Sequence, residues 1–294
     1  MEYISVAEAA EKWKVSERSV RNYCAEGRVS GACLAKGQWL LPKHAAKPER
    51  RPRRQADTLP LRLQQEKESG LSGGIYHKLQ VEFAYNSNHI EGSRLTHEQT
   101  RFIYETNTIG VQEEAVNVND IIEAANHFRC FDYVLEQAGR PLSEGFIKKL
   151  HAILKAGTAD SRRAWFAVGD YKRLPNEAGG AATAAPGEVA AEMKELLRSY
   201  NRQKKKTLED IIDFHYRLEK IHPFQDGNGR VGRLVMFKEC LRNGIVPFII
   251  EDDLKLFYYR GLREYQREPG YLVETCLSAQ DRFKAYLDYF QISY

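Results

Sequence analysis

The sequence predicts a mainly α-helical protein with a small β-hairpin and a separate small N-terminal module. Apolar residues recur at helical spacing over most of residues 74–294. Only residues 169–189 break this pattern, with glycine, proline and asparagine signals that indicate a hairpin between helices. The 294 residues are 43% hydrophobic, which is enough for a core and excludes a disordered chain.

Residues 1–50 predict a small module of two short helices and a hairpin. The stretches 6–13 and 16–27 have helical patterning, and Ser16 and Gly27 are suited to start and stop the second helix. Two short apolar segments split by a Lys-Gly pair follow, which is typical of a hairpin or wing.

The first part of the chain is also basic. Residues 1–55 hold twelve basic and six acidic residues, an excess larger than the net charge of +4 of the whole chain. The module resembles the winged helix-turn-helix modules of the MerR and excisionase type, which implies that its second helix contacts DNA. The candidate DNA contacts are Arg18, Arg21 and Asn22. A helical docking module with a solvated basic tail is the alternative.

Residues 51–73 are expected to form a linker. The stretch 47–60 contains three prolines and a cluster of arginines, and SGLSGG at 69–74 is a second break. We therefore place the main domain at residues 74–294.

The helices of the main domain follow from end signals as well as apolar stripes. Thr207 and Asp210 form a capping-box pattern. A helix over 228–243 is expected to end at Gly244. Further helices are expected at 254–266 and 271–290.

The chain is expected to be cytoplasmic, with no membrane partner. Its five cysteines are scattered and include no C-x-x-C pair, which disfavours a disulfide framework. The N-terminus lacks the apolar run of a signal peptide, and no stretch approaches the roughly 18 apolar residues of a membrane helix. The net charge of +4 is too small to indicate nucleic acid by itself.

The segment HPFQDGNGRVGR, residues 222–233, has the features of an anion site. Gly227 and Gly229 stand where a helix is expected to begin, and the first N–H groups of a helix have no internal partners. Arg230 and Arg233 are three residues apart and share a face of that helix. Paired arginines at a glycine-opened helix N-terminus favour a phosphate.

Two further residues of the segment add chemistry. Asp226 suits a Mg²⁺ ion that bridges phosphates. His222, at the end of the preceding helix, can act as a base near neutral pH. Each group alone is more often structural, but their combination indicates attack on a nucleotide phosphate.

The segment matches every fixed position of the motif H-x-F-x-[D/E]-G-N-G-R-x-x-R, so the chain resembles the Fic family, from about residue 74 to its end. The resemblance implies a helical fold, a hairpin flap over the site, and transfer of AMP from ATP to a hydroxyl of a target protein with Mg²⁺ or Mn²⁺. Carried over by position, the roles are a general base at His222, a core anchor at Phe224, a metal ligand at Asp226, and phosphate contacts from Gly227, Asn228, Gly229, Arg230 and Arg233.

The resemblance also covers elements outside the motif. Residues 176–180 resemble the flap, and the family's post-motif region resembles the chain beyond Asn243. Doc-type relatives, which phosphorylate, carry a lysine in the anion nest, whereas this sequence keeps Gly229 and Arg230, which favours AMP transfer. The additional candidates for nucleotide contact are Gly179, Gly180, Tyr258 and Gln266.

The stretch SNHIEG, residues 87–92, resembles the inhibitory motif [S/T]-x-x-x-E-[G/N] of the family. Ser87 and Glu91 are four residues apart and share a helical face. The resemblance implies that Glu91 pairs with Arg233 and blocks the γ-phosphate, so residues 74–92 would be an inhibitory helix. An ordinary helix end capped by Gly92 is the alternative.

Together these patterns predict an autoinhibited adenylyltransferase that modifies a Ser, Thr or Tyr hydroxyl of a target protein or of itself. Removal of AMP, or transfer of another nucleotide at the same site, is one alternative. A DNA-binding regulator whose Fic domain senses a nucleotide is another. A metal site at His215, Glu219 and His222 is less favoured than a buried, hydrogen-bonded His215. The resemblance leaves homo-oligomerisation open.

Overall fold

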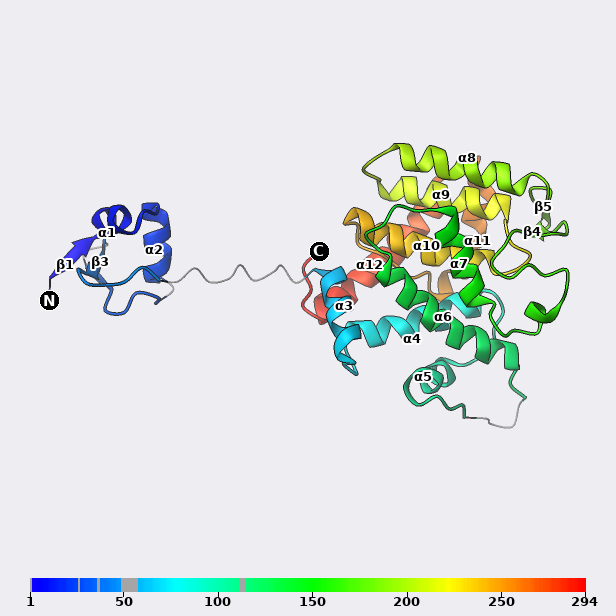
Figure 1. Ribbon diagram of the computed structural model, residues 1–294, viewed down its shortest axis with the longest axis horizontal. Helices are drawn as coiled ribbons and strands as arrows, with labels where there is room; N and C mark the ends of the chain where they lie inside the picture. The colour runs from blue at the N-terminus through cyan, green and yellow to red at the C-terminus, as the bar shows by residue number, and fades with distance from the viewer. Residues whose placement is uncertain (1, 26, 36–37, 49–57, 111–114) are drawn as a thin grey trace. The chain divides into compact units, whose positions relative to one another are not determined.

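The computed structural model describes residues 2–25, 27–35, 38–48, 58–110 and 115–294. The chain divides into two compact units, residues 1–56 and 57–294 (Figure 1). Within the described ranges, no helix is both long and apolar enough to cross a membrane.

The first unit combines two helices with a three-stranded antiparallel sheet of order β1-β3-β2. Ser5 and Glu8 form a capping box, and Lys14 in the left-handed conformation ends the first helix. The helices and hairpin lie where the sequence placed them, and their assignment to a DNA-binding class stays a prediction. The elements are β1 (Tyr3–Ser5), α1 (Val6–Trp13), α2 (Glu17–Ala25), β2 (Cys33–Ala35) and β3 (Gln38–Pro42).

Within residues 58–110 and 115–294, the second unit is helical with one short hairpin, as the sequence predicts. Its elements are α3 (Leu59–Ser69), α4 (Ile75–Ile90), α5 (His97–Thr106), α6 (Val118–Glu136), α7 (Glu144–Leu154), the 3₁₀ turn η1 (Asp160–Arg162), β4 (Glu177–Ala178), β5 (Ala181–Ala182), α8 (Val189–Arg202), α9 (Leu208–Ile221), α10 (Asn228–Asn243), the 3₁₀ turn η2 (Asp252–Leu254), α11 (Lys255–Glu264) and α12 (Gly270–Tyr289).

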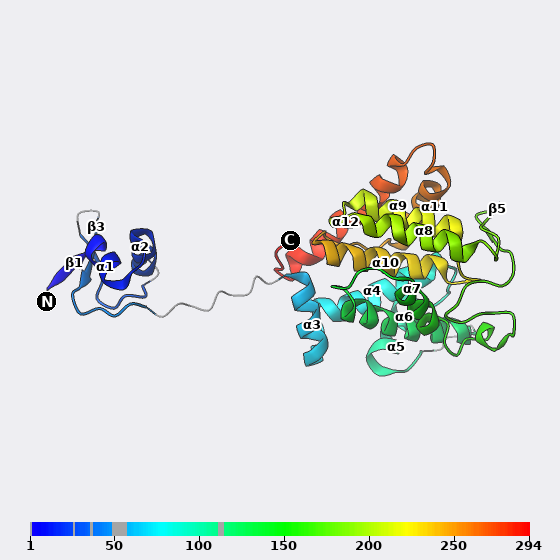
Figure 2. The same ribbon diagram turned by 45° about the horizontal axis from the view of Figure 1, so that its top comes forward.

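Helix α10 is the centre of the second unit. It packs against α4, α6, α7 and α9, and both views show it among these helices (Figures 1 and 2). Every residue from Asn228 to Leu241 is buried. A helix that is buried all round is expected to be apolar, but this one also carries charges, and Lys238 pairs with Glu239 at 2.7 Å with both side chains fully buried. Buried charges require such partners.

Hydrogen bonds between residues of the loop fix the conformation of the connection between α9 and α10. His222 ends α9 in the left-handed conformation, and Gly227, with φ of 88°, begins α10. The Asn228 side chain accepts a hydrogen bond from the Phe224 N–H and donates one to the Phe224 carbonyl, both at 2.8 Å. The predicted span of α10, with Gly244 as its left-handed C-cap, is confirmed.

The structure differs from the prediction over the second half of the expected linker. Residues 59–69 form α3, and Leu59 and Leu63 belong to the main core. The buried side chain of Glu66 accepts a hydrogen bond from a backbone N–H in the first turn of α4. Pro60 lies in the first turn of α3, where a proline costs no hydrogen bond. Residues 51–57 lie outside the described residues.

The expected hairpin is present between α7 and α8. Strands β4 and β5 pair antiparallel. Gly179 and Gly180 connect them with φ of 58° and 79°, the conformation of a type I′ turn, which favours glycine at both positions.

Gly261 marks a close contact between α11 and α12. A Cβ there would lie 2.7 Å from the Cα and 2.9 Å from the backbone N of Leu272. Because backbone atoms cannot move aside as a flexible side chain can, we expect Gly261→Ala to lower the free energy of unfolding by about 1–3 kcal/mol in urea titrations. Gly145→Ala in α7, where a Cβ meets nothing within 4 Å, is the control and should not destabilise. Equal stability of Gly261→Ala and wild type would contradict this packing.

Candidate active site

His222 lies at the C-terminal end of α9 with its ring 18% exposed. Its Nδ1 lies 3.3 Å from the carbonyl oxygen of Glu219. A carbonyl only accepts, so Nδ1 carries the proton of this bond and Nε2 is free to act as a base. Burial lowers the pKa of His222, although the bond to Glu219 opposes the effect in part. The ring is therefore neutral at pH 7, as a general base must be.

A second histidine, His151 of α7, supports the loop. Its ring stacks on Phe224 with centroids 4.0 Å apart. The Gly169 N–H donates to Nδ1 at 2.9 Å, so Nε2 carries the proton and donates to the Asp226 carbonyl at 3.1 Å. Burial lowers the pKa of His151 to about 3. His151 is thus a neutral support that fixes the path of the chain beside the metal-ligand candidate.

The base of the hairpin is anchored to the same loop. The buried ammonium of Lys172 donates to Asn176 Oδ1 at 2.7 Å, to Thr183 Oγ1 at 2.6 Å and to the Ile221 carbonyl at 3.2 Å. Asn176 Nδ2 donates to the Phe224 carbonyl at 2.9 Å. Burial lowers the pKa of Lys172 to about 8. The hairpin that bears Gly179 and Gly180 is therefore held beside His222, although both glycines are themselves exposed.

Arg233 forms the predicted ion pair with Glu91. Its Nη2 lies 2.7 Å from Glu91 Oε1, and it also donates to the Ser87 carbonyl at 2.8 Å, while Nε donates to Ser87 Oγ at 3.0 Å. The guanidinium lies 5.7 Å from the centre of the Tyr258 ring. Nη1 is buried and makes no hydrogen bond to any described residue. Nε and Nη2 are therefore the guanidinium nitrogens that hold Arg233 to Ser87 and Glu91.

The carboxylate of Glu91 lies at the N-terminal end of α10. A Cβ at Gly229 would clash with Glu91 Oε1 and would lie 2.9 Å from Arg233 Nη1. Gly229 therefore permits this close approach, since a larger side chain would push the carboxylate and the guanidinium aside, and its backbone angles do not require glycine. The N-terminal end of a helix attracts anions, and no side chain caps α10. An acidic side chain of the protein thus lies in the position expected for a phosphate.

Arg230 and Asp226 belong to a second charged cluster. Arg230 is 4% exposed, and it pairs with Glu123 of α6 and, at 3.2 Å, with Asp226. Lys155, at the end of α7, pairs with the same two carboxylates. Although burial acts in the opposite direction, Arg230 and Lys155 hold the pKa of Asp226 well below its usual value. Nε of Arg230 makes no hydrogen bond within the described ranges.

The donor set at Asp226 limits how a divalent metal would bind. No group of three His, Cys, Asp or Glu residues in the described part of the chain could hold a metal by itself. Mg²⁺ often takes only one or two carboxylates from the protein and the rest of its oxygens from phosphates and water. The residues therefore fit a metal held mainly by a nucleotide and do not fit a site made by the protein alone.

The structure places the other predicted residues as follows. Gly92, with φ of 97°, directly follows Glu91 at the end of α4. Tyr258 is 1% exposed, and its hydroxyl forms a hydrogen bond with His215 Nε2 at 2.7 Å. This burial favours a structural role, in which Tyr258 supports Arg233 from the core. Gln266 lies in the exposed turn after α11. Their predicted contacts with a nucleoside stay predictions, whereas the buried, hydrogen-bonded His215 is confirmed.

Of the predicted DNA contacts, Arg21 and Asn22 are exposed on α2. Arg21 forms an i,i+4 ion pair with Glu17 at 2.9 Å. The side chain of Arg18 lies outside the described part of the structure.

Sequence reasoning missed the polar residues that support the motif from other helices. Their sequence signal is weak, because each is a single polar residue in an otherwise ordinary helix or loop. His151 is the exception, since a histidine on the apolar face of α7 needs a buried hydrogen-bond partner. The missed residues are Glu123, His151, Lys155 and Lys172, and the contacts of Asn88 and Asn176 within the predicted stretches 87–92 and 176–180 were also not predicted.

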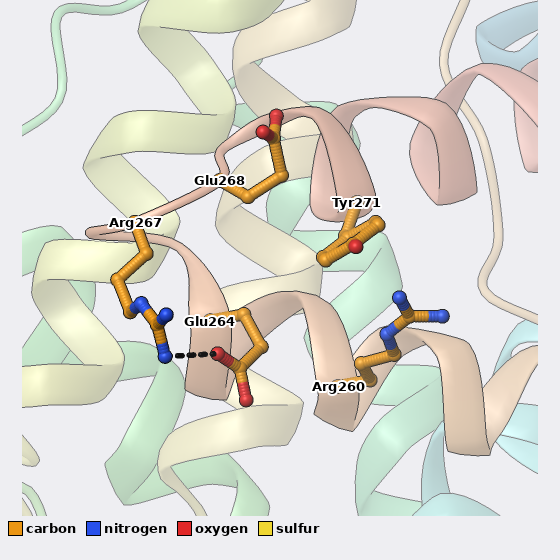
Figure 3. A pocket seen from close by; sticks show the side chains of 5 residues that line it. All are labelled: Arg260, Glu264, Arg267, Glu268 and Tyr271. Carbon is orange, nitrogen blue, oxygen red and sulfur yellow. Dashed lines mark ion pairs between the residues drawn. The ribbon is translucent and has the colours of Figure 1, made fainter.

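A surface pocket of about 380 Å³ lies elsewhere, on α11 and the start of α12. Figure 3 shows its lining, in which Arg267 pairs with Glu264 at 4.0 Å. None of the motif residues lines it. The lining residues are Arg260, Glu264, Arg267, Glu268 and Tyr271.

Comparison with protein families gives a match that includes the segment 222–233. Residues 141–240 match the sequence model of the Fic/DOC family. The protein adenylyltransferase Fic of Drosophila melanogaster is 29% identical over 187 residues, which cover 61% of this chain and 36% of the fly protein. The protein of the same name from Drosophila grimshawi matches to the same extent. The chain thus spans little more than a third of the length of the curated relatives it matches.

Solved structures show the same fold. A Fic domain containing signaling protein from Bacteroides thetaiotaomicron is 27% identical, covers 78% of this chain and 90% of its own length, and aligns with a TM-score of 0.58. A Fic family protein from Desulfovibrio desulfuricans is 22% identical, covers 78% of this chain and 70% of its own length, and has a TM-score of 0.59. At this identity the second likeness supports the fold alone.

The contact between Gly229 and Glu91 can be tested by stability. Gly229→Ala would displace the Glu91 carboxylate from the guanidinium of Arg233, and we expect a loss of about 2–4 kcal/mol in the free energy of unfolding. With Glu91→Ala in the same chain, most of the clash is gone, so the two changes should cost at least about 1 kcal/mol less than the sum of their separate effects. Urea titration of all four proteins measures this coupling, and additive effects would show that Glu91 does not lie against Gly229.

Proposed function

We propose that this chain, in which residues 141–240 match the sequence model of the Fic/DOC family, is an autoinhibited adenylyltransferase that transfers AMP from ATP to a hydroxyl side chain of a target protein or of itself. The observation that carries the proposal is the carboxylate of Glu91 on the guanidinium of Arg233, at the anion-attracting end of α10. The curated relatives that match the chain bear the name protein adenylyltransferase.

The proposed reaction uses His222 as the base. A neutral Nε2 takes the proton of the target hydroxyl while the hydroxyl oxygen attacks the α-phosphorus of ATP. The bond from the α-phosphorus to the bridging oxygen breaks, and pyrophosphate leaves with that oxygen. The free Nη1 of Arg233 and the uncapped N–H groups of α10 are suited to bind the phosphates. A divalent metal held by the nucleotide and Asp226 would offset phosphate charge when bound.

Glu91 is the proposed brake on this reaction. Its carboxylate accepts a hydrogen bond from Nη2 of Arg233, and a γ-phosphate would bind the same guanidinium. A carboxylate and a phosphate cannot both lie against Gly229, because a single methyl group would already clash there. Nucleotide binding in a productive position therefore requires Glu91 to leave, and the two states compete by their relative free energies.

The brake predicts a gain of activity when Glu91 is removed. We expect Glu91→Gly to raise AMP labelling of the chain or of proteins in a lysate at least about tenfold, because about 1.4 kcal/mol of released competition suffices. Labelling with ATP radioactive at the α-phosphate, followed by intact mass, measures the rate and identifies the transferred group.

The control for this experiment is Glu91→Gly combined with His222→Ala, in which labelling should fall by about 10²–10⁴-fold while ATP still binds. Labelling that survives the loss of His222 would refute its role as base. An unchanged rate in Glu91→Gly would refute the brake. A mass increment other than that of AMP would assign a different nucleotide.

We propose, secondly, that residues 1–50 bind duplex DNA. The support is the arrangement of α1 and α2 across a tight turn, followed by the β2–β3 hairpin, in a part of the chain with an excess of basic residues. Helix α2 exposes Arg21 and Asn22, the side chain types that contact phosphates and bases.

DNA binding predicts a salt-dependent affinity. In fluorescence anisotropy with duplex DNA, we expect Arg21→Ala to weaken binding and to lower the slope of log affinity against log salt by about one. Lys204→Ala removes an exposed charge of the second unit and is the control, with no change expected. Equal weakening by both changes, or no binding by the wild type, would contradict the proposal.

A further inference from the structure

Lys155 is a buried ammonium between two carboxylates of the candidate site. The residue is 1% exposed. Its Nζ pairs with Glu123 Oε1 and lies 2.6 Å from Asp226 Oδ2. Asp160, the next carboxylate, lies at 3.9 Å. An ammonium in contact with two carboxylate oxygens takes the place where these oxygens could otherwise bind a divalent cation.

The chain around Lys155 is fixed, so the position of the ammonium is set in advance. Lys155 caps the C-terminal end of α7, and Thr158 Oγ1 donates to its carbonyl at 2.9 Å. Asn126 of α6 donates to the carbonyls of the two neighbouring residues, Leu154 and Ala156, at 2.9 and 2.7 Å. These bonds tie the end of α7 to α6, which also carries Glu123.

Lys155 also touches the motif itself. A Cβ at Gly227, the residue that begins α10, would lie 3.7 Å from Lys155 Cδ. Arg230 pairs with the same Glu123 and Asp226. Asp226 Oδ2 thus contacts two cations, while the Asp226 side chain as a whole is 48% exposed and can be reached by a ligand. The Lys155 side chain thus lies near Gly227, at the anion-attracting end of α10, and its ammonium contacts Asp226, the residue before Gly227.

We propose that Lys155 is a cation built into the nucleotide site, standing where a divalent metal would otherwise bridge Glu123 and Asp226. As a consequence, the chain alone binds divalent metal weakly, and the ammonium supplies part of the positive charge that the phosphates meet. That the adjacent anion is a nucleotide phosphate rests on the proposed function. The competition between Lys155 and a metal does not, because it follows from the charges and contacts alone.

The direct test is Mn²⁺ binding by the full chain without nucleotide, followed by the electron paramagnetic resonance signal of free Mn²⁺. Lys155→Met keeps the length of the side chain but removes its charge, and we expect it to bind Mn²⁺ at least about tenfold more tightly than wild type. Adding Glu123→Gln should abolish this gain. Lys149→Met removes an exposed charge of the same helix and should leave Mn²⁺ affinity unchanged.

An unchanged Mn²⁺ affinity in folded Lys155→Met, or an equal gain in Lys149→Met, would overturn the proposal and leave Lys155 as a structural ion-pair partner. If Lys155→Met fails to fold by circular dichroism, Lys155→Gln replaces it with the same expectation.

A third measurement needs no change at Lys155. In Glu91→Gly, ATP affinity in EDTA should stay within about tenfold of its value with Mg²⁺, whereas a loss confined to EDTA would contradict a resident cation.

These outcomes separate the inference from the proposed function. Tighter Mn²⁺ binding by Lys155→Met supports the built-in cation even if Glu91→Gly transfers no AMP. An absence of ATP binding under both conditions counts against the proposed function, and the Mn²⁺ titration then decides alone on Lys155.

Discussion

The fold depends on placing charged side chains along a helix that is buried on every side. Helix α10 carries Arg230 and Arg233 at 4% and 2% exposure, and removing the partner of such a buried charge costs several kcal/mol. The surrounding helices must therefore supply carboxylates, and they do so from α4 and α6, with Glu91 and Glu123. The same helix contacts therefore determine both the packing of the second unit and the electrostatics of the candidate site.

The two arginines differ in how their buried charges are compensated. Arg230 pairs with both Glu123 and Asp226, and Glu123 is only 13% exposed, so Arg230 keeps a buried carboxylate partner even when a ligand reaches Asp226. Arg233 depends on Glu91, which is 28% exposed and lies at the C-terminal end of α4. A carboxylate at the edge of the structure can exchange with solvent or with a ligand far more readily than one inside it. This difference in exposure is the reason that the proposed regulation is assigned to Arg233 and not to Arg230.

Much of the site could be predicted because its chemistry is local in sequence. Residues 222–233 contain the proposed base, the loop and the helix start within one segment, and the end signals of α10 predicted the bounds of that helix. Glu123, His151 and Lys155 could not be found in this way, since their roles arise only when α6 and α7 pack beside the loop. Helix α3 was missed for a related reason. Its proline and charges resemble a linker, and only burial of Leu59 and Leu63 against distant helices stabilises it as a helix.

In the proposed brake, Ser87 and Glu91 have separate roles, so Glu91 could leave without disturbing the rest of the candidate site. Ser87 holds Arg233 through both its hydroxyl and its carbonyl, at 3.0 and 2.8 Å, and neither bond involves the carboxylate. When Glu91 leaves, these two bonds still orient the guanidinium, and the charge that becomes unpaired is the one a phosphate can satisfy. In the proposed brake, Glu91 would control access to Arg233, while Ser87, one turn earlier on α4, would keep the guanidinium in position for a phosphate.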